Sequence, residues 1–217
     1  MLSIFHQACD DATLWSYTLK VAINVSPVQF RSGQLIRHLE AALSDTGLPA
    51  SRVELEVTET SLLHENEATL ATLRAMHALG ARIVLDDFGT GFASLSYLRS
   101  FPFDRIKIDR SFVKDFGLRN DADAIIRAIV GLGKSLRIPV TAEGVETAEQ
   151  LELVRAEGCD EAQGYLISEP IPAADVPALF ARLAPGFPVA AIPTGAAEPA
   201  AAPAYAPPEG NRAACPR

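Results

Sequence analysis

The sequence predicts an α/β fold whose parallel strands close toward a TIM-like (β/α) barrel. Short apolar stretches of strand length alternate with stretches whose apolar residues recur at helical spacing, and this alternation is typical of a parallel sheet. One strand, "RIKID", places Arg105 and Lys107 on one face and Ile106 and Ile108 on the other. Parallel strands covered on both faces are usually continuous hydrophobic runs. Charges on an inner face therefore favour a polar cavity such as the mouth of a barrel.

The strands follow one another at intervals that leave room for a helix between each pair. The expected strands are 19–25, 53–57, 82–87, 105–109, 138–143 and a short one near 161–166. The expected helices are amphipathic stripes within 35–43, 70–77 and 125–136, and a fourth that starts at the capping-box pair Thr147 and Gln150. Glycines at 47, 80 and 158 mark where the first, second and fourth of these helices end.

Composition narrows the classes of function. A chain of 217 residues with 48% hydrophobic residues can bury one sizeable core. A net charge of −8 argues against binding a polymeric nucleic acid through a broad basic surface. Three distant cysteines, Cys9, Cys159 and Cys215, indicate a reducing compartment, and there is neither a signal peptide nor a membrane-length apolar run. We therefore expect a cytoplasmic protein with no membrane segment.

The C-terminal segment differs in composition from the rest. Residues 184–217 hold 8 of the 15 prolines and 12 alanines. Such a segment cannot sustain a helix and has little to bury. The predicted organisation is a barrel domain at 1–183 and a disordered Ala/Pro-rich tail at 184–217.

Polar groups that can hold a hard cation stand at or just after the end of almost every expected strand. In chain order they are Asn24; Glu56 and Glu59; Asp86 and Asp87; Lys107 and Asp109; Glu143 and Glu146; and Gln163. Taken singly, each has an ordinary explanation as a turn, a helix start or an ion pair. Together, carboxylates and an amide at successive strand ends favour Mg²⁺ or Mn²⁺, and no Cys/His pattern for zinc accompanies them.

Six ordered motifs resemble the EAL domain family, bacterial phosphodiesterases that open cyclic di-GMP. They are "NVSPVQF" (24–30), "ELEVTET" (54–60), "DDFGTGFASLSYL" (86–98), "IKIDRSFV" (106–113), "TAEGVET" (141–147) and "QGYLISEP" (163–170). The resemblance covers roughly residues 1–183. It implies a barrel with two Mg²⁺ or Mn²⁺ ions at its mouth and the linear dinucleotide pGpG as product.

The resemblance also assigns roles to individual residues. Asn24, Glu56 and Asp86 would bind the first ion, Asp86 would bridge, and Asp87 with Glu143 would bind the second. Glu143 is alternatively the general base, and the sequence leaves both roles open. Lys107 would face the attacking water and the phosphate, with Gln163 helping to position that water. Glu59 would support the "DDFGTGF" loop, and Glu146 would be a second supporting acid.

The sequence departs from the family pattern at its start. No Glu-Ala-Leu triplet occurs, and 3–15 resembles the helix that follows the Glu-Ala-Leu strand. We therefore expect about six of eight strands, one metal ligand fewer, and an open parallel edge. Such a domain is expected either to be marginally stable or to form a homodimer that covers the opening.

Three other functions compete with the enzyme. A domain that binds cyclic di-GMP without cleaving it would fit the missing Glu, although the remaining acids and Lys107 speak against selected loss of catalysis. A protein-interaction module using the barrel helices is a second alternative. An unrelated barrel acting on sugar phosphates is the third, and "QGYLISEP" is a poor phosphate loop for it.

Overall fold

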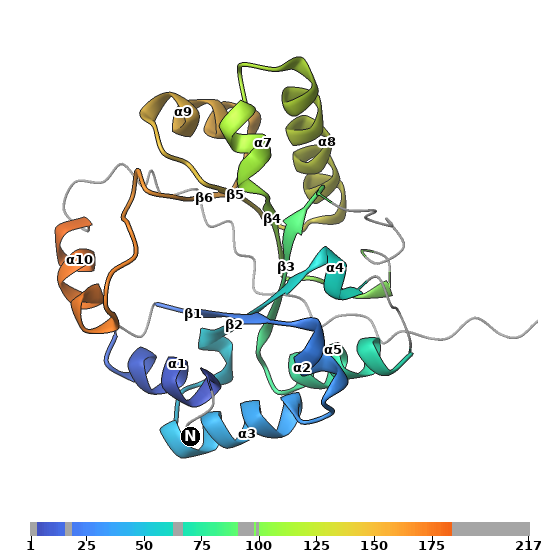
Figure 1. Cartoon of the computed structure of the whole chain (residues 1–217), viewed down its shortest axis with the longest axis vertical. Coiled ribbons are helices and arrows are strands. Elements are labelled where there is room, and N and C mark those ends of the chain that lie inside the picture. The colour runs from blue at the N-terminus through green and yellow to red at the C-terminus, as the bar shows by residue number, and fades with distance from the viewer. Residues whose placement is uncertain (1–3, 16–18, 63–66, 91–97, 99, 184–217) are drawn as a thin grey trace, which may run out of the picture. The chain divides into compact units, whose positions relative to one another are not determined.

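Six parallel strands form one continuous sheet in the computed structural model, which describes residues 4–15, 19–62, 67–90, 98 and 100–183. The strands follow chain order across the sheet, so each pairs with its neighbours in the sequence (Figure 1). They are β1 (Val21–Val25), β2 (Val53–Thr58), β3 (Arg82–Phe88), β4 (Arg105–Ile108), β5 (Val140–Glu143) and β6 (Glu161–Gln163). All six expected strands are confirmed, with ends shifted by a few residues.

The sheet is a half-barrel. Each interior strand is hydrogen-bonded to two neighbours, whereas β1 pairs only with β2 and β6 only with β5 among the described residues. The predicted TIM-like fold with about six of eight strands is therefore confirmed. The expected tail, 184–217, lies outside the described residues, and its boundary stays a prediction.

Helices connect consecutive strands and pack against the outer face of the sheet (Figure 1). The α-helices are α1 (Ile4–Thr13), α2 (Pro27–Arg31), α3 (Leu35–Thr46), α4 (Glu59–Leu62), α5 (Glu67–Ala78), α7 (Arg110–Asp115), α8 (Asn120–Leu136), α9 (Ala148–Glu157) and α10 (Val176–Leu183). Two short 3-10 helices, η1 (Ala50–Arg52) and η2 (Ala173–Asp175), complete the described elements. Among the described helices, none has the length and apolarity to cross a lipid bilayer.

Local sequence signals explain where several helices start and stop. α3 ends at Gly47, whose φ of 69° is left-handed, and α9 starts with the Thr147–Gln150 capping box. Both features were expected from the sequence, because glycine tolerates positive φ and the capping box satisfies free N–H groups.

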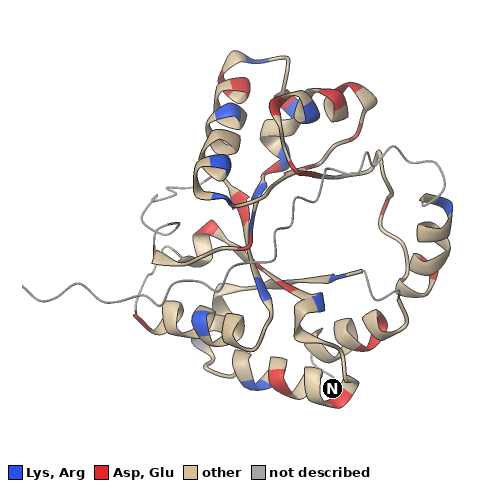
Figure 2. Cartoon of the chain, turned by 180° about the vertical axis from the view of Figure 1, so that it is seen from behind, with Lys and Arg blue, Asp and Glu red and all other residues tan. Residues whose placement is uncertain are grey.

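The two faces of the strands differ as the alternation predicts. On β2 and β4 the outward side chains Leu55, Ile106 and Ile108 are fully buried beneath the helices. The charged residues of these strands face inward, and Figure 2 shows acidic and basic positions on the central strands as well as on the outer helices. A curved sheet accommodates this arrangement because its concave side forms a polar lumen.

Two glycines of α8 offer a test of how tightly the helix packs on the sheet. A Cβ on Gly133 would lie 2.4 Å from Val140 Cγ2 and 2.8 Å from the Ile138 carbonyl oxygen, whereas a Cβ on Gly131 would meet no atom within 4 Å. We expect Gly133→Ala to lower the free energy of unfolding by about 1–3 kcal/mol through overpacking. Gly131→Ala should raise it by up to about 1 kcal/mol, because alanine favours the helix.

Chemical denaturation of the two variants measures both effects. Equal shifts of the same sign would contradict the close contact between α8 and β5.

Candidate functional site

The predicted site residues gather at the carboxyl ends of the strands. Asn24 on β1 is in register with Glu56 on β2, and Glu143 on β5 is in register with Gln163 on β6. Asp86 lies near the end of β3, and Lys107 lies in β4. In parallel sheets the carboxyl ends share one edge, so residues far apart in sequence converge there.

Lys107 is the centre of the cluster. Its ammonium Nζ lies 2.6 Å from Glu56 Oε1, 2.5 Å from Glu143 Oε1 and 3.4 Å from Asp86 Oδ1. The lysine is only 5% exposed, and Glu56 and Asp86 are buried as well. One cation therefore links strands β2, β3, β4 and β5 across the lumen.

A break in the regular geometry of β3 places both aspartates at the site. Successive side chains of a strand point to opposite faces, so Asp86 and Asp87 would normally diverge. The register of β3 with β4 shifts between Leu85 and Phe88, and Asp87 has a left-handed φ of 53°. Such a backbone is unfavourable for a non-glycine residue. As a result, oxygens of Asp86, Asp87 and Glu143 lie within 4.8 Å of one another.

The cluster has an excess of negative charge. Three carboxylates surround the single ammonium of Lys107. Burial raises the pKa values of Glu56 and Glu143 above 4.5, although Lys107 opposes the shift. For Lys107, burial acts against the charged form, but the hydrogen bonds that its ammonium donates to Glu143 and Glu56 outweigh this effect and raise its pKa above 10.5. The ammonium therefore stays charged, and the acids have room for further positive charge.

The donor set fits a hard divalent cation. Asp86, Asp87 and Glu143 offer only oxygen ligands, close enough to share an ion. Burial, followed by the charges of Asp86 and Asp109, raises the pKa of Asp87. An ion bound among these oxygens would relieve that repulsion.

Asp109 is a site residue to which the resemblance gave no role. Its carboxyl group lies near Asp87 and helps to raise the pKa of Asp87, and it also caps α7 by accepting from the Ser111 N–H at 2.9 Å. The sequence placed it at the end of the fourth strand. The sequence signal for a role of Asp109 in the site was its position two residues after Lys107. A role in the turn that starts α7 explained the same aspartate equally well.

The two acids predicted to support the loop differ. Glu59 is 2% exposed, and its Oε2 accepts a hydrogen bond from the Gly89 N–H at 3.4 Å, so it contacts the start of the "DDFGTGF" loop. Glu146 is exposed in the turn before α9, where its backbone N–H donates to Gln150 Oε1. Within the described residues, Glu146 does not join the cluster around Lys107.

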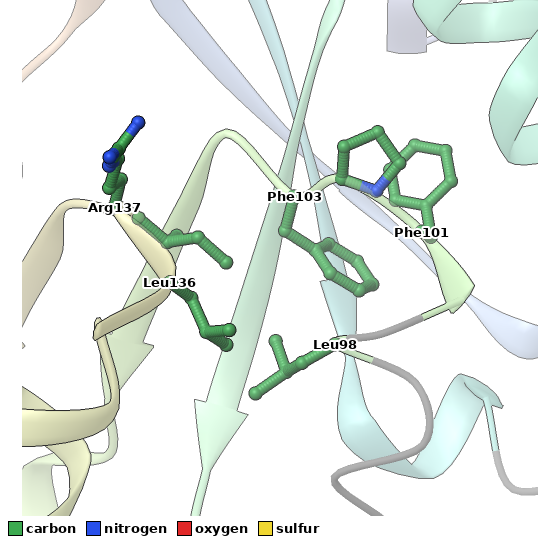
Figure 3. A pocket seen from close by; sticks show the side chains of 7 residues that line it. Leu98, Phe101, Phe103, Leu136 and Arg137 are labelled. Carbon is green, nitrogen blue, oxygen red and sulfur yellow. The ribbon is translucent and has the colours of Figure 1, made fainter. Parts of the chain in front are cut away.

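A separate pocket of about 380 Å³ lies at the opposite end of the strands (Figure 3). Two of its lining residues, Phe103 and Ile138, stand just before β4 and β5. Leu98, Phe103 and Leu136 point toward one another, and among the described lining residues Arg137 carries a charge. The described lining of this pocket is otherwise apolar side chains, in contrast to the acids gathered at the carboxyl ends.

Comparison with known proteins agrees with the arrangement. The EAL domain family model matches residues 2–170. The cyclic di-GMP phosphodiesterase NbdA of Pseudomonas aeruginosa is 40% identical over 156 residues, which make up 72% of this chain and 20% of that protein. The chain spans about a fifth to a quarter of the length of the curated relatives it matches.

Solved structures are similar in fold as well as in sequence. The PaMucR phosphodiesterase in complex with c-di-GMP matches with a TM-score of 0.76 and 38% identity, over 79% of this chain and 71% of that one. Klebsiella pneumoniae BlrP1 in its manganese and cyclic di-GMP complex at pH 6 gives a TM-score of 0.66 and 33% identity, over 76% of this chain and 42% of that one.

Removal of the Lys107 ammonium is expected to destabilise the metal-free protein. Lys107→Met would leave the buried Glu56 and Asp86 and the half-buried Glu143 without their shared cation, and we expect the free energy of unfolding to fall by about 3–5 kcal/mol. The matched control is Lys114→Met on α7, where the lysine is exposed. Denaturation with urea in the presence of EDTA measures both, and a loss no larger than that of the control would contradict the role of Lys107.

Binding of Mn²⁺ should release protons in mildly acidic solution. Because the pKa values of Glu56, Asp87 and Glu143 are raised, the folded protein holds protons that the unfolded chain has already lost. These groups therefore favour the metal-free folded state at low pH, and that contribution is lost as the pH rises through the raised values. A cation needs the ionised carboxylates, so its apparent affinity should increase with pH.

Calorimetry of Mn²⁺ binding in two buffers of different ionisation enthalpy, at about pH 5.5 and about pH 8, measures the release. The same proton count at both pH values would show that these carboxyl groups do not bind the ion.

Proposed function

The chain belongs to the EAL domain family, and from this premise we propose that it hydrolyses cyclic di-GMP to linear pGpG with two Mg²⁺ or Mn²⁺ ions. The observation that carries the proposal is the buried Lys107 among Glu56, Asp86 and Glu143, next to Asp87 at the carboxyl ends of the strands. Relatives named as cyclic di-GMP phosphodiesterases, and a similar structure holding manganese and this nucleotide, support it.

The residues that would hold the ions follow from the strand ends. Asn24, Glu56 and Asp86 would hold the first ion, and Asp86, Asp87 and Glu143 the second. When bound, such ions polarise the phosphate, lower the pKa of water and neutralise developing charge. They also make a negatively charged site acceptable to an anionic substrate, because they reverse the local sign of charge.

The chain's own side chains would orient the reactants and stabilise charge. Lys107 keeps its proton, since its pKa is raised, so it acts as a fixed cation beside the phosphate oxygens rather than as a base. Glu143 serves either as an ion ligand or as the base that takes a proton from water. The Gln163 amide, in register with Glu143, would orient that water.

The reaction balances as a simple hydrolysis. The water oxygen forms a new bond to phosphorus, one P–O ester bond of the ring breaks, and the departing alcohol oxygen takes up a proton. One ring opening gives the linear dinucleotide. We place this reaction in the cytoplasm, because the two described cysteines, Cys9 and Cys159, are free thiols, as is usual in a reducing compartment.

The decisive experiment follows pGpG formation by chromatography after incubation with cyclic di-GMP and Mg²⁺ or Mn²⁺. We expect Glu143→Gln to lower the rate by about 10²–10⁴-fold, in the range of a lost general base or metal ligand. The control is Glu152→Gln, an exposed residue of α9 whose carboxylate pairs with Arg155 at 3.0 Å, and it should leave the rate unchanged.

Calorimetry with cyclic di-GMP, and gel filtration with and without it, would separate the alternatives. Tight binding without product from folded protein would instead favour the nucleotide-binding module. A dimer that forms without any binding would favour the interaction module.

A further inference from the structure

A second polar layer lies inside the half-barrel. The Arg105 guanidinium contacts two carboxylates, through Nη1 to Glu54 Oε2 at 2.8 Å and through Nη2 to Glu161 Oε1 at 2.7 Å. Lys20, just before β1, donates to the other oxygen of Glu54, Oε1, at 2.8 Å. Arg105 and Glu54 are largely buried, with side-chain exposures of 14% and 8%. We call these four residues the Arg105 layer.

The Arg105 layer lies directly beneath the candidate site. Its members Glu54, Arg105 and Glu161 each stand two residues before a site residue on the same face of the same strand, namely before Glu56, Lys107 and Gln163. Two residues of a strand span about 6.6 Å. A shift of any of these strands at the lower layer is therefore transmitted to a site residue one layer above.

The link to β6 has a particular mechanical role. β6 is three residues long and is hydrogen-bonded to β5 alone within the described sheet. Glu161 and Arg105 are 56 residues apart in sequence, and their ion pair ties β6 to β4 across the lumen. Through its other carboxylate partner the same guanidinium ties β4 to β2, passing over β3.

The charge of the Arg105 layer distinguishes it from the site above. Two cations face two carboxylates, so the layer is neutral, whereas the Lys107 cluster carries excess negative charge. The Arg105 Nε atom is buried without a hydrogen-bond partner in the described structure. The guanidinium therefore uses its two Nη atoms to contact the carboxylates of Glu54 and Glu161, while its Nε donor is left without a partner. This orientation is the one expected of a bridge between strands.

We propose that Arg105 is a positioning residue, whose guanidinium couples β2, β4 and β6 and so holds Glu56 in the position that cation binding requires and Gln163 in register with Glu143. The part that concerns cation binding rests on the proposed function. Arg105 would act entirely through its neighbours and would touch neither ion nor substrate.

The test uses a charge-balanced double variant, Arg105→Met/Glu161→Gln, which breaks the bridges from β4 to both β2 and β6 without changing net charge. Glu54 keeps Lys20 as its partner. We expect the Mn²⁺ affinity, measured by calorimetry, to fall by about 10–100-fold, the usual effect of losing a residue that orients metal ligands. The single variant Arg105→Met distinguishes a geometric effect from an electrostatic one. Loss of a positive charge alone would strengthen cation binding, so a weaker Mn²⁺ affinity in this variant indicates lost positioning.

The matched control is the surface pair Arg127 and Glu157, whose Nε and Oε2 lie 3.3 Å apart. Arg127→Met/Glu157→Gln should leave the Mn²⁺ affinity within twofold of that of the wild type. Arg105→Lys, whose ammonium bridges two carboxylates less well than a guanidinium, should lose less Mn²⁺ affinity than Arg105→Met but should not reach the wild-type value. All measurements are made at a temperature at which circular dichroism shows every variant folded. A purely structural role would lower the melting temperature but leave the Mn²⁺ affinity of the folded protein unchanged, and that result would overturn the proposal.

A second readout needs no metal. Amide hydrogen exchange of Ala162 and Gln163 in β6 should be at least about tenfold faster in the double variant, with the amides of β3 unchanged. If the wild-type protein binds no Mn²⁺, the proposed metal chemistry is wrong. The coupling of β6 to β4 through Arg105 is then tested by amide hydrogen exchange alone. Unchanged exchange in β6 would overturn the coupling of the strands.

Discussion

The ammonium of Lys107 is the interaction on which the site depends. It is costly to bury the carboxylates of Glu56 and Asp86 and to half-bury that of Glu143, and a single lysine contacts all three. Lys107 neutralises only part of the negative charge, since one ammonium faces three carboxylates. The remaining negative charge of such a site would favour a divalent cation, which would compete with protons at low pH because the pKa values of Glu56 and Glu143 are raised.

The adjacent aspartates show how backbone strain can serve such a site. A regular strand would send Asp86 to the lumen and Asp87 to the helices. The register shift on β3 and the left-handed Asp87 bring both carboxylates within reach of Glu143. The cost of the backbone conformation is of order 1–3 kcal/mol, and the surrounding sheet supports it. Glu59 contacts the same region through the Gly89 N–H, directly after the strand.

The lumen as a whole is organised in two polar layers with different tasks. The upper layer, around Lys107, is negatively charged and offers chemistry. The lower layer, around Arg105, is neutral and connects strands that the hydrogen-bonded sheet does not connect directly. This division suits a half-barrel, in which β1 and β6 each have one hydrogen-bonded neighbour in the described sheet.

Local sequence patterns predicted the order of the six strands, the four helices α3, α5, α8 and α9, the inward charges of β2 and β4, and the capping box that starts α9, because these depend on local periodicity and on nearby residues. It also located the strand-end residues that converge, apart from Glu146, which lies exposed outside the cluster. The three-dimensional structure was needed to show that Lys107 contacts three acids, that Asp109 lies near Asp87, and that Arg105 reaches Glu161. The partners of Lys107 and Arg105 lie on other strands, up to 56 residues away in sequence. Which of them meet is fixed by the register and curvature of the sheet, and a local sequence pattern carries neither.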